Sequence, residues 1–319
     1  MLSRVADSCL WLSRYLERAE TCARILDVNM QLVLDFEDQN SGSSDGHWLP
    51  ILATLQDKDL FETLHPEPSP DSVMDFVTFE KTNPNSILSS VTCARENART
   101  VREQISSEMW EELNGQFLYL HSPAARAAFR ESPIGFYRGL VGRLHAFQGV
   151  TDATMTHGEG WQFLQAGKYI ERADSTSRVL DFKYHVLLPS EEEVGGNVDI
   201  TQWMAVLRSC SAMEAYFKLS HGRVSAWDVA GFLVLHDSFP RSIRFCVDAL
   251  DLALHSISGS DRGHFANEAE RLSGMLRSNL DFTTVDQIFQ TGLHQYLDQI
   301  QVRLGAVSNA LWGTYCRWL

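Results

Sequence analysis

Two short stretches of the chain carry the residues best suited to chemistry. Residues 15–29 read YLERAETCARILDVN, and residues 169–183 read YIERADSTSRVLDFK. Glu17 and Glu171 each precede an arginine and lie one residue from an apolar position, so we expect both carboxylates in a crevice between helices. Such groups can form a buried structural network, bind the amine or carboxylate of a substrate, or lie on a solvated face. The sequence favours the network and leaves the other two open.

Other kinds of site find little support in the sequence. Metal sites in ferritin-like bundles use Glu-x-x-His pairs, and the helices that carry Glu17 and Glu171 offer none. The neighbouring arginines would also repel a cation. The 11 histidines are scattered, and there is no Walker loop or dinucleotide-binding fingerprint. We therefore expect no metal and no cofactor, and the sequence names no catalytic residue.

Long amphipathic helices must position these residues. Apolar residues recur at steps of three and four from Leu2 to Val33, which predicts a first helix of about nine turns. Turn-forming residues at 40–46 are expected to follow it, and a second long helix is expected over residues 160–188. Pro84 suits the first turn of a further helix, because its missing N–H is no loss there. With little strand alternation, the chain is predicted to be all-α.

The two stretches belong to a longer internal repeat. At offsets of 154 to 156 residues, Trp48 matches Trp203, residues 73–77 match 229–233, and NPNSI at 83–87 matches FPRSI at 239–243. The matches keep the same order along the chain. This order predicts a duplication, with pseudo-repeat 1 over about residues 1–125 and pseudo-repeat 2 over about residues 154–319.

The duplication predicts the architecture. We expect a single domain over residues 1–319, built as a multi-helix bundle with approximate two-fold pseudo-symmetry. The matched long helices would pack near the pseudo-axis. Some polar residues have no counterpart in the other half, so a symmetric pair of sites is not expected: Glu96, Asn97, Arg99, Arg102 and Glu214.

Composition limits the partners and the compartment. The formal net charge of −14 offers no obvious footprint for nucleic acid or an anionic membrane surface. The six cysteines lack zinc-site spacing, and the first 20 residues contain no long apolar run that could be a signal peptide or a membrane span. We expect a cytoplasmic protein in a reducing compartment.

Four stretches in this order resemble the bacterial alpha-E family, a domain of unknown function: ADSCLWLSRYLERAETCARILDVN, ARENARTVREQIS, GWQFLQAGKYIERADSTSRVLD and FPRSIRFC. The likeness spans essentially the whole chain, although Cys9 and His236 look atypical. The resemblance places the family motifs on nine residues, and the unmatched Glu214 joins them. The candidate binding residues are Glu17, Arg18, Arg24, Glu96, Asn97, Arg99, Glu171, Arg172, Arg178 and Glu214.

The resemblance implies which proteins act together with this chain, but it does not establish the chain's own reaction. Members of this family usually occur beside, or fused to, a circularly permuted ATP-grasp protein. A transglutaminase-like protein and a proteasome-like peptidase are further implied neighbours. These implied neighbours suggest ATP-dependent formation of an amide or peptide bond, followed by proteolytic trimming of the product.

These observations lead to one expected function and two alternatives. We expect a helical partner that docks an ATP-grasp ligase and presents an amine or peptide acceptor in a Glu/Arg-lined crevice. Glu17 or Glu171 would hold the amine, and Arg99 or Arg178 would hold a carboxylate. One alternative is an autonomous enzyme that uses a crevice glutamate as a general base. The other is a purely structural adaptor, so the sequence leaves open whether the chain is catalytic.

Overall fold

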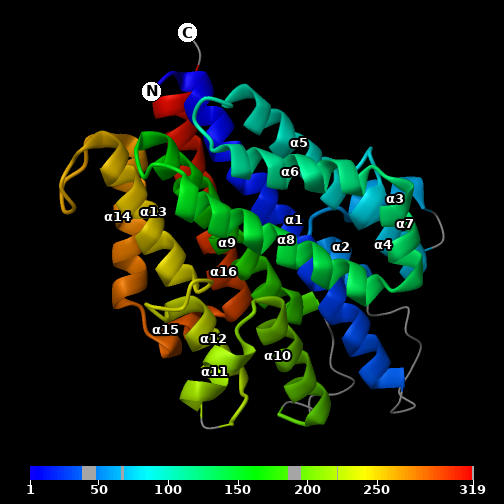
Figure 1. The fold of residues 1–319 in the computed structure, drawn as a ribbon. Coiled ribbons are helices and arrows are strands. Elements are labelled where there is room, and N and C mark those ends of the chain that lie inside the picture. The colour runs from blue at the N-terminus through cyan, green and yellow to red at the C-terminus, as the bar shows by residue number, and fades with distance from the viewer. Residues whose placement is uncertain (38–47, 66–67, 186–194, 221, 318–319) are drawn as a thin grey trace.

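The computed structural model describes residues 1–37, 48–65, 68–185, 195–220 and 222–317. Within these residues the protein is a bundle of α-helices without a strand, as the sequence predicts (Figure 1). The turn expected at residues 40–46 lies outside the described residues. No helix in the described part is long and apolar enough to cross a membrane.

The described residues up to Thr154 form eight helices. They are α1 (Ser3–Glu37), α2 (Leu49–Thr54), α3 (Lys58–Leu64), α4 (Pro70–Phe79), α5 (Ile87–Thr100), α6 (Ser107–Leu120), α7 (Pro123–Glu131) and α8 (Pro133–Thr154). The described residues after Thr154 form eight more. They are α9 (Glu159–His185), α10 (Asn197–Ser209), α11 (Met213–Ser220), α12 (Ala226–Leu235), α13 (Ile243–Ser258), α14 (Glu268–Phe282), α15 (Val285–Thr291) and α16 (Leu293–Leu311). A short π-helical turn, Trp312–Cys316, follows α16.

The two long helices that carry the repeated motif, α1 and α9, pack on each other at the centre of the bundle. Helix α1 also packs on α5 and α8, whereas α9 packs on α13 and α16. Figure 1 shows α5, α6 and α7 on one side of this central pair and α13 and α14 on the other. The central pair therefore positions the Glu-Arg motifs between two groups of helices.

Small residues let α1 and α9 approach closely. A Cβ atom on Gly167 would lie 2.2 Å from the carbonyl oxygen of Leu10, so only glycine fits there. Nearby, the Ser13 hydroxyl donates a hydrogen bond to the carbonyl oxygen of Leu164 at 2.7 Å. At an offset of 154 residues, Leu10 matches Leu164 and Ser13 matches Gly167. The closest approach of the two helices is therefore built from matched positions.

The helices after the NPNSI and FPRSI segments begin later than expected. Pro84 lies in a turn, and α5 starts at Ile87. The expectation that Pro84 occupies the first turn is wrong, because Ser86 is the N-cap and accepts a hydrogen bond from the N–H of Ser89. In the second copy, Ser242 caps α13 in the same way.

Helices α2 and α10 end in the same kind of turn. Gln56 and Ser211 are the two described non-glycine residues with positive φ, at 60° and 50°. In each turn the next N–H bonds back five residues, from Asp57 to Leu52 at 2.9 Å and from Ala212 to Leu207 at 2.8 Å. The two turns lie 155 residues apart in the sequence. The two turns have the same hydrogen-bond pattern at matched positions, which supports the predicted duplication.

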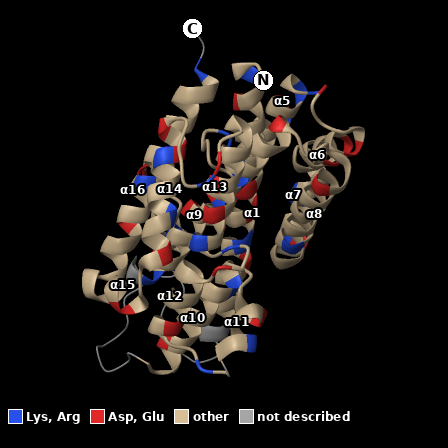
Figure 2. Ribbon diagram, turned by 90° about the vertical axis from the view of Figure 1, so that its left-hand side faces the viewer, with Lys and Arg blue, Asp and Glu red and all other residues tan. Residues whose placement is uncertain are grey.

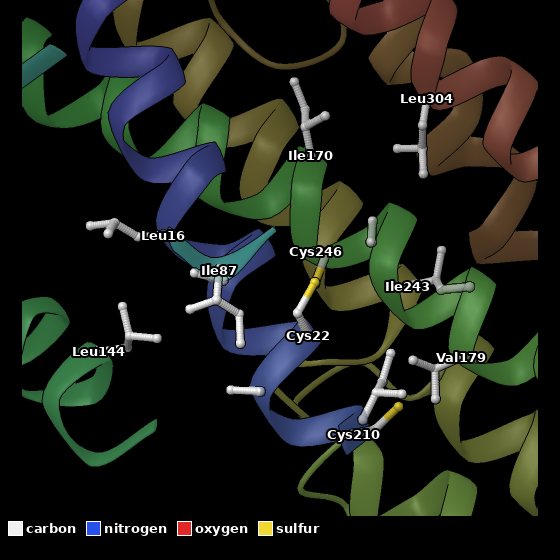
Figure 3. Close-up of a cluster of buried hydrophobic side chains, with 14 of the residues drawn as sticks. Leu16, Cys22, Ile87, Leu144, Ile170, Val179, Cys210, Ile243, Cys246 and Leu304 are labelled. Atoms are coloured by element: carbon white, nitrogen blue, oxygen red, sulfur yellow. The ribbon is translucent and has the colours of Figure 1, made fainter. Parts of the chain in front are cut away.

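Five of the six cysteines lie within the apolar core. All six are free thiols, and five of them are buried. Figure 3 shows Cys22, Cys210 and Cys246 among aliphatic side chains of the central helices. Burial, the largest effect, raises the pKa of the Cys22 thiol to about 12. These cysteines act as small core residues and not as nucleophiles.

Candidate functional site

Where α1 and α9 cross at the centre of the bundle, the glutamate of each Glu-Arg motif pairs with the arginine of the other. We call this place the crossing. Glu17 on α1 accepts a hydrogen bond from Arg172 on α9, with 3.0 Å between Nε and Oε2. Glu171 on α9 accepts one from Arg18 on α1, with 2.8 Å between Nε and Oε1. The two glutamates are only 1% and 4% exposed. The expected crevice between helices is present, and the solvated-face alternative is wrong for these residues.

The Glu17 side of this crossing is closed by α8. Gln148 on α8 donates a hydrogen bond to Glu17 at 2.6 Å and accepts one from Arg172 at 3.1 Å. Arg241, in the turn before α13, lies 3.8 Å from the second oxygen of Glu17. Burial alone would lower the pKa of the Arg172 guanidinium. The negative charge of Glu17 outweighs burial, so the pKa is raised. On this side Glu17 and Arg172 are both buried and paired, and α8 closes the network.

Glu20 extends the closed network by one helical turn. Its buried carboxylate pairs with Arg24 on the same helix and also with Arg241. The ring Nε2 of His145 on α8 lies 2.8 Å from the same carboxylate. Burial alone would raise the pKa of Glu20, but Arg241, His145 and Arg24 hold it well below its usual value. Glu20 therefore acts as an anion that joins α1 to α8 and α13.

The Glu171 side is built differently. Arg14 donates through Nε to Glu171 at 2.8 Å and through Nη1 to Ser308 on α16 at 2.9 Å. Arg18 donates through Nη1 to Asn85 at 2.9 Å. The side chains of Arg14 and Arg18 are 15% and 24% exposed, against 7% for Arg172 on the closed side. This second network is reached by solvent.

Glu171 stays ionised on this side. Burial would raise the pKa of its carboxyl group, but the charges of Arg18 and Arg14 outweigh burial and lower it. A general base at neutral pH needs a pKa near the operating pH. The arrangement therefore suits an anchor for arginines better than a proton acceptor.

A cavity of about 650 Å³ opens beside Glu171, between α1, α9, α16 and the turn after α2. Its polar wall includes Arg178, which makes two hydrogen bonds to Asp174, the shorter of them 2.7 Å long. Its apolar wall includes Trp11, Val179 and Leu304. The cavity is therefore lined by three arginines (Arg14, Arg18 and Arg178), by two acids (Glu171 and Asp174) and by apolar surface. Such a cavity can bind a ligand with both charged and apolar parts.

The ten candidate residues do not all gather at this place. Those at or next to the crossing are Glu17, Arg18, Arg24, Glu171, Arg172 and Arg178. Glu96 instead pairs along α5 with Arg95 and Arg99, at 2.6 Å each, and Asn97 bonds to its own helix. Glu214 is exposed on α11.

The expectation that Arg99 acts beside Glu17 or Glu171 is therefore wrong. Helix α5 turns its apolar residues Val91, Ala94 and Ala98 into the core. This orientation leaves Arg99 exposed on the outside of α5. The sequence motif alone could not show which face of α5 packs on α1.

Sequence reasoning missed several members of the two networks. Arg14 and Glu20 were visible as neighbours of Glu17 on the same helix face, because residues three or four positions apart lie side by side. His145, Gln148 and Ser308 gave no signal, since α8 and α16 carry no recognisable motif. Among the described residues, no group of three His, Cys, Asp or Glu side chains is placed to hold a metal ion.

Comparison with known proteins finds relatives in mycobacteria. The chain is 26% identical over 274 residues to uncharacterized proteins of Mycobacterium bovis and Mycobacterium tuberculosis, a match that covers 81% of this chain. The chain spans only about 30% of the length of these relatives. No solved structure matches it.

The chain contains three Glu-Arg dipeptides, at residues 17–18, 171–172 and 270–271. The first two are those that exchange partners between α1 and α9. A family model described as a predicted alpha-helical domain with a conserved ER motif matches residues 1–316, and the chain therefore belongs to the Alpha-E family.

Proposed function

We propose that this chain is the helical partner of an ATP-grasp ligase and that its cavity presents an amine or peptide acceptor for ATP-dependent amide bond formation. The observation that carries the proposal is the cavity beside Glu171, where three arginines and two acids meet. Arginine can hold the carboxylate of a peptide, and an acid such as Asp174 can hold an amine. The chain has no nucleotide-binding motif, so activation by ATP belongs to the partner.

The length of the relatives supports a larger partner. The Mycobacterium proteins are matched over only 30% of their length, so most of each polypeptide lies outside the matched region. In the proposal, that remainder includes the ligase. A transglutaminase-like protein or a proteasome-like peptidase would then act on the product, in the cytoplasm.

The two alternatives fit the site less well. An autonomous enzyme with a glutamate base would need a raised pKa, and the pKa of Glu171 is lowered. A purely structural adaptor explains the closed network around Glu17. It gives no reason for a cavity of about 650 Å³ beside the second copy of the same motif.

Two measurements test the proposal. The tagged chain is purified from its native cells, and mass spectrometry should identify an ATP-grasp protein bound to it. Amide formation by the reconstituted pair is then compared for the wild type, Arg178→Gln and Asp174→Asn. We expect each variant to lower turnover by about tenfold or more, the size expected for a lost charge-assisted hydrogen bond.

Glu268→Gln is the matched control, because Glu268 forms an exposed ion pair on α14 away from the cavity. It should leave turnover unchanged. Full turnover by both cavity variants, or turnover by the purified chain without the ligase, would show that the proposal is wrong.

A further inference from the structure

We propose that the cavity beside Glu171 binds the free C-terminal carboxylate of a short peptide. This inference rests on the proposed function and names the end of the acceptor that the cavity holds. The carboxylate would lie against Arg14, Arg18 and Arg178, and the C-terminal side chain against the apolar wall.

Each of the three arginines has a donor to spare. Arg14 and Arg18 use Nε and Nη1 for hydrogen bonds, whereas Arg178 uses Nε and Nη2. One terminal nitrogen of each therefore makes no hydrogen bond to another described residue. All three side chains line the same cavity. Each spare nitrogen can donate a charge-assisted hydrogen bond, so the three arginines together can hold one carboxylate.

The charge of the cavity wall selects a single carboxylate. Three guanidinium groups face the two carboxylates of Glu171 and Asp174, which leaves one uncompensated positive charge. One carboxylate balances that charge, whereas a phosphate dianion would leave the cavity wall with excess negative charge. This positive wall lies inside a chain of net charge −14, so it is a local feature and not a general property of the surface.

The size and the apolar wall of the cavity suit a peptide end. A volume of about 650 Å³ falls within the range of about 300–1,000 Å³ that is usual for small-molecule sites. Ile25, Val179 and Leu304 line it with aliphatic surface for a side chain. Trp11 lies under Arg14, whose guanidinium carbon is 4.4 Å from the ring centroid, so the ring holds this arginine in place.

Isothermal titration calorimetry on the purified chain tests the inference without the ligase. The probes are dipeptides that end in Leu, Phe or Lys, each as the free acid and as its C-terminal amide, together with inorganic phosphate. At least one free acid should bind about tenfold or more tightly than its amide, because the amide lacks the charge that arginine recognises. Equal binding of acid and amide, no binding of any acid, or tighter binding of phosphate would overturn the inference.

A pair of glycine variants locates the binding. Gly305 on α16 lines the cavity, and a Cβ atom there would meet no atom within 4 Å. Gly305→Phe should therefore fill the cavity without disturbing the helix and weaken binding by tenfold or more. Gly139→Phe is the control, because Gly139 faces open space on α8. Equal binding by both variants would contradict the assignment.

The two proposals can fail separately. Peptide binding without recovery of an ATP-grasp protein would leave this inference standing and contradict the proposed partner. Recovery of the ligase, with no peptide binding by the chain, would contradict this inference alone.

Discussion

The two sides of the α1–α9 crossing use the same Glu-Arg motif for different purposes. On one side α8 packs against Glu17, and Gln148 satisfies the pair. On the other side α16 contributes only Ser308 to the pair, and a cavity remains beside Glu171. Figure 2 shows α16 on one side of the two central helices and α8 on the other. The role of each motif therefore depends on the helix that packs against it.

The largest expected effect tests the closed side. Glu17→Gln leaves Arg172 buried without its carboxylate, and removal of one partner from a buried pair costs about 3–5 kcal/mol. Urea denaturation should show the free energy of unfolding lowered by that amount. Replacement of both residues, as Glu17→Met with Arg172→Met, should recover most of the loss. A loss below about 1 kcal/mol for Glu17→Gln would show that this side is not closed to water.

The next effect tests the contact that both sides share. Gly167→Ala places a methyl group 2.2 Å from a backbone oxygen of α1, which cannot move aside as a side chain can. The helices must separate, at a cost of about 1–3 kcal/mol in the free energy of unfolding, and peptide binding should weaken as well. Gly142→Ala on α8 meets open space and should be stabilising by about 0.5–1 kcal/mol. Equal denaturation midpoints for the two variants would contradict the close approach.

A smaller effect is expected on the open side. Glu171→Gln leaves Arg14 and Arg18 without their carboxylate, but both are partly exposed and water can solvate them. We expect the free energy of unfolding to fall by about 1–2 kcal/mol, less than for Glu17→Gln. Paired denaturation curves give this difference directly. If Glu17→Gln and Glu171→Gln lower the free energy of unfolding by the same amount, the proposed contrast between the two sides is wrong.

A pH dependence also belongs to the closed side. Lys168 occupies the position that matches Arg14, and burial, followed by Arg172, lowers its pKa from 10.5 to about 8. Between these two values the unfolded chain binds more protons than the folded chain, so stability contributed by this group rises with pH across that window. Below pH 8 both states are protonated, and the folded state carries the full penalty.

Lys168→Met removes this group. The difference in stability between the variant and the wild type should be largest below pH 8 and shrink toward pH 10.5, which denaturation at a series of pH values can measure. A difference that does not change with pH would mean that Lys168 keeps its ordinary pKa in the folded protein.

Much of the fold could be predicted from the sequence, because helical periodicity and turn residues are local signals. The helical class, the two long helices and the burial of Glu17 and Glu171 all follow from such patterns. The duplication remains a prediction that the matching turns and crossed pairs support. The apolar spacing of Val91, Ala94 and Ala98 does indicate the face of α5 that packs in the core, but the family motif led us to place Arg99 in the site.

The site depends on packing between distant segments, which local patterns do not show. An offset in the sequence reveals that Glu17 and Glu171 are matched residues, but not that each pairs with the arginine of the other. Gln148 and Ser308 join the site only because α8 and α16 lie against the crossing. Their own sequences carry no sign of this role.

The exchange of partners between α1 and α9 makes the two halves of the chain dependent on each other. A protease cut at residues 156–158, just before α9, would leave Glu17 and Arg18 on one fragment and Glu171 and Arg172 on the other. Neither fragment could neutralise its own buried charges. The fragments would have to associate to be stable, so the centre of this single chain behaves as the interface of a dimer.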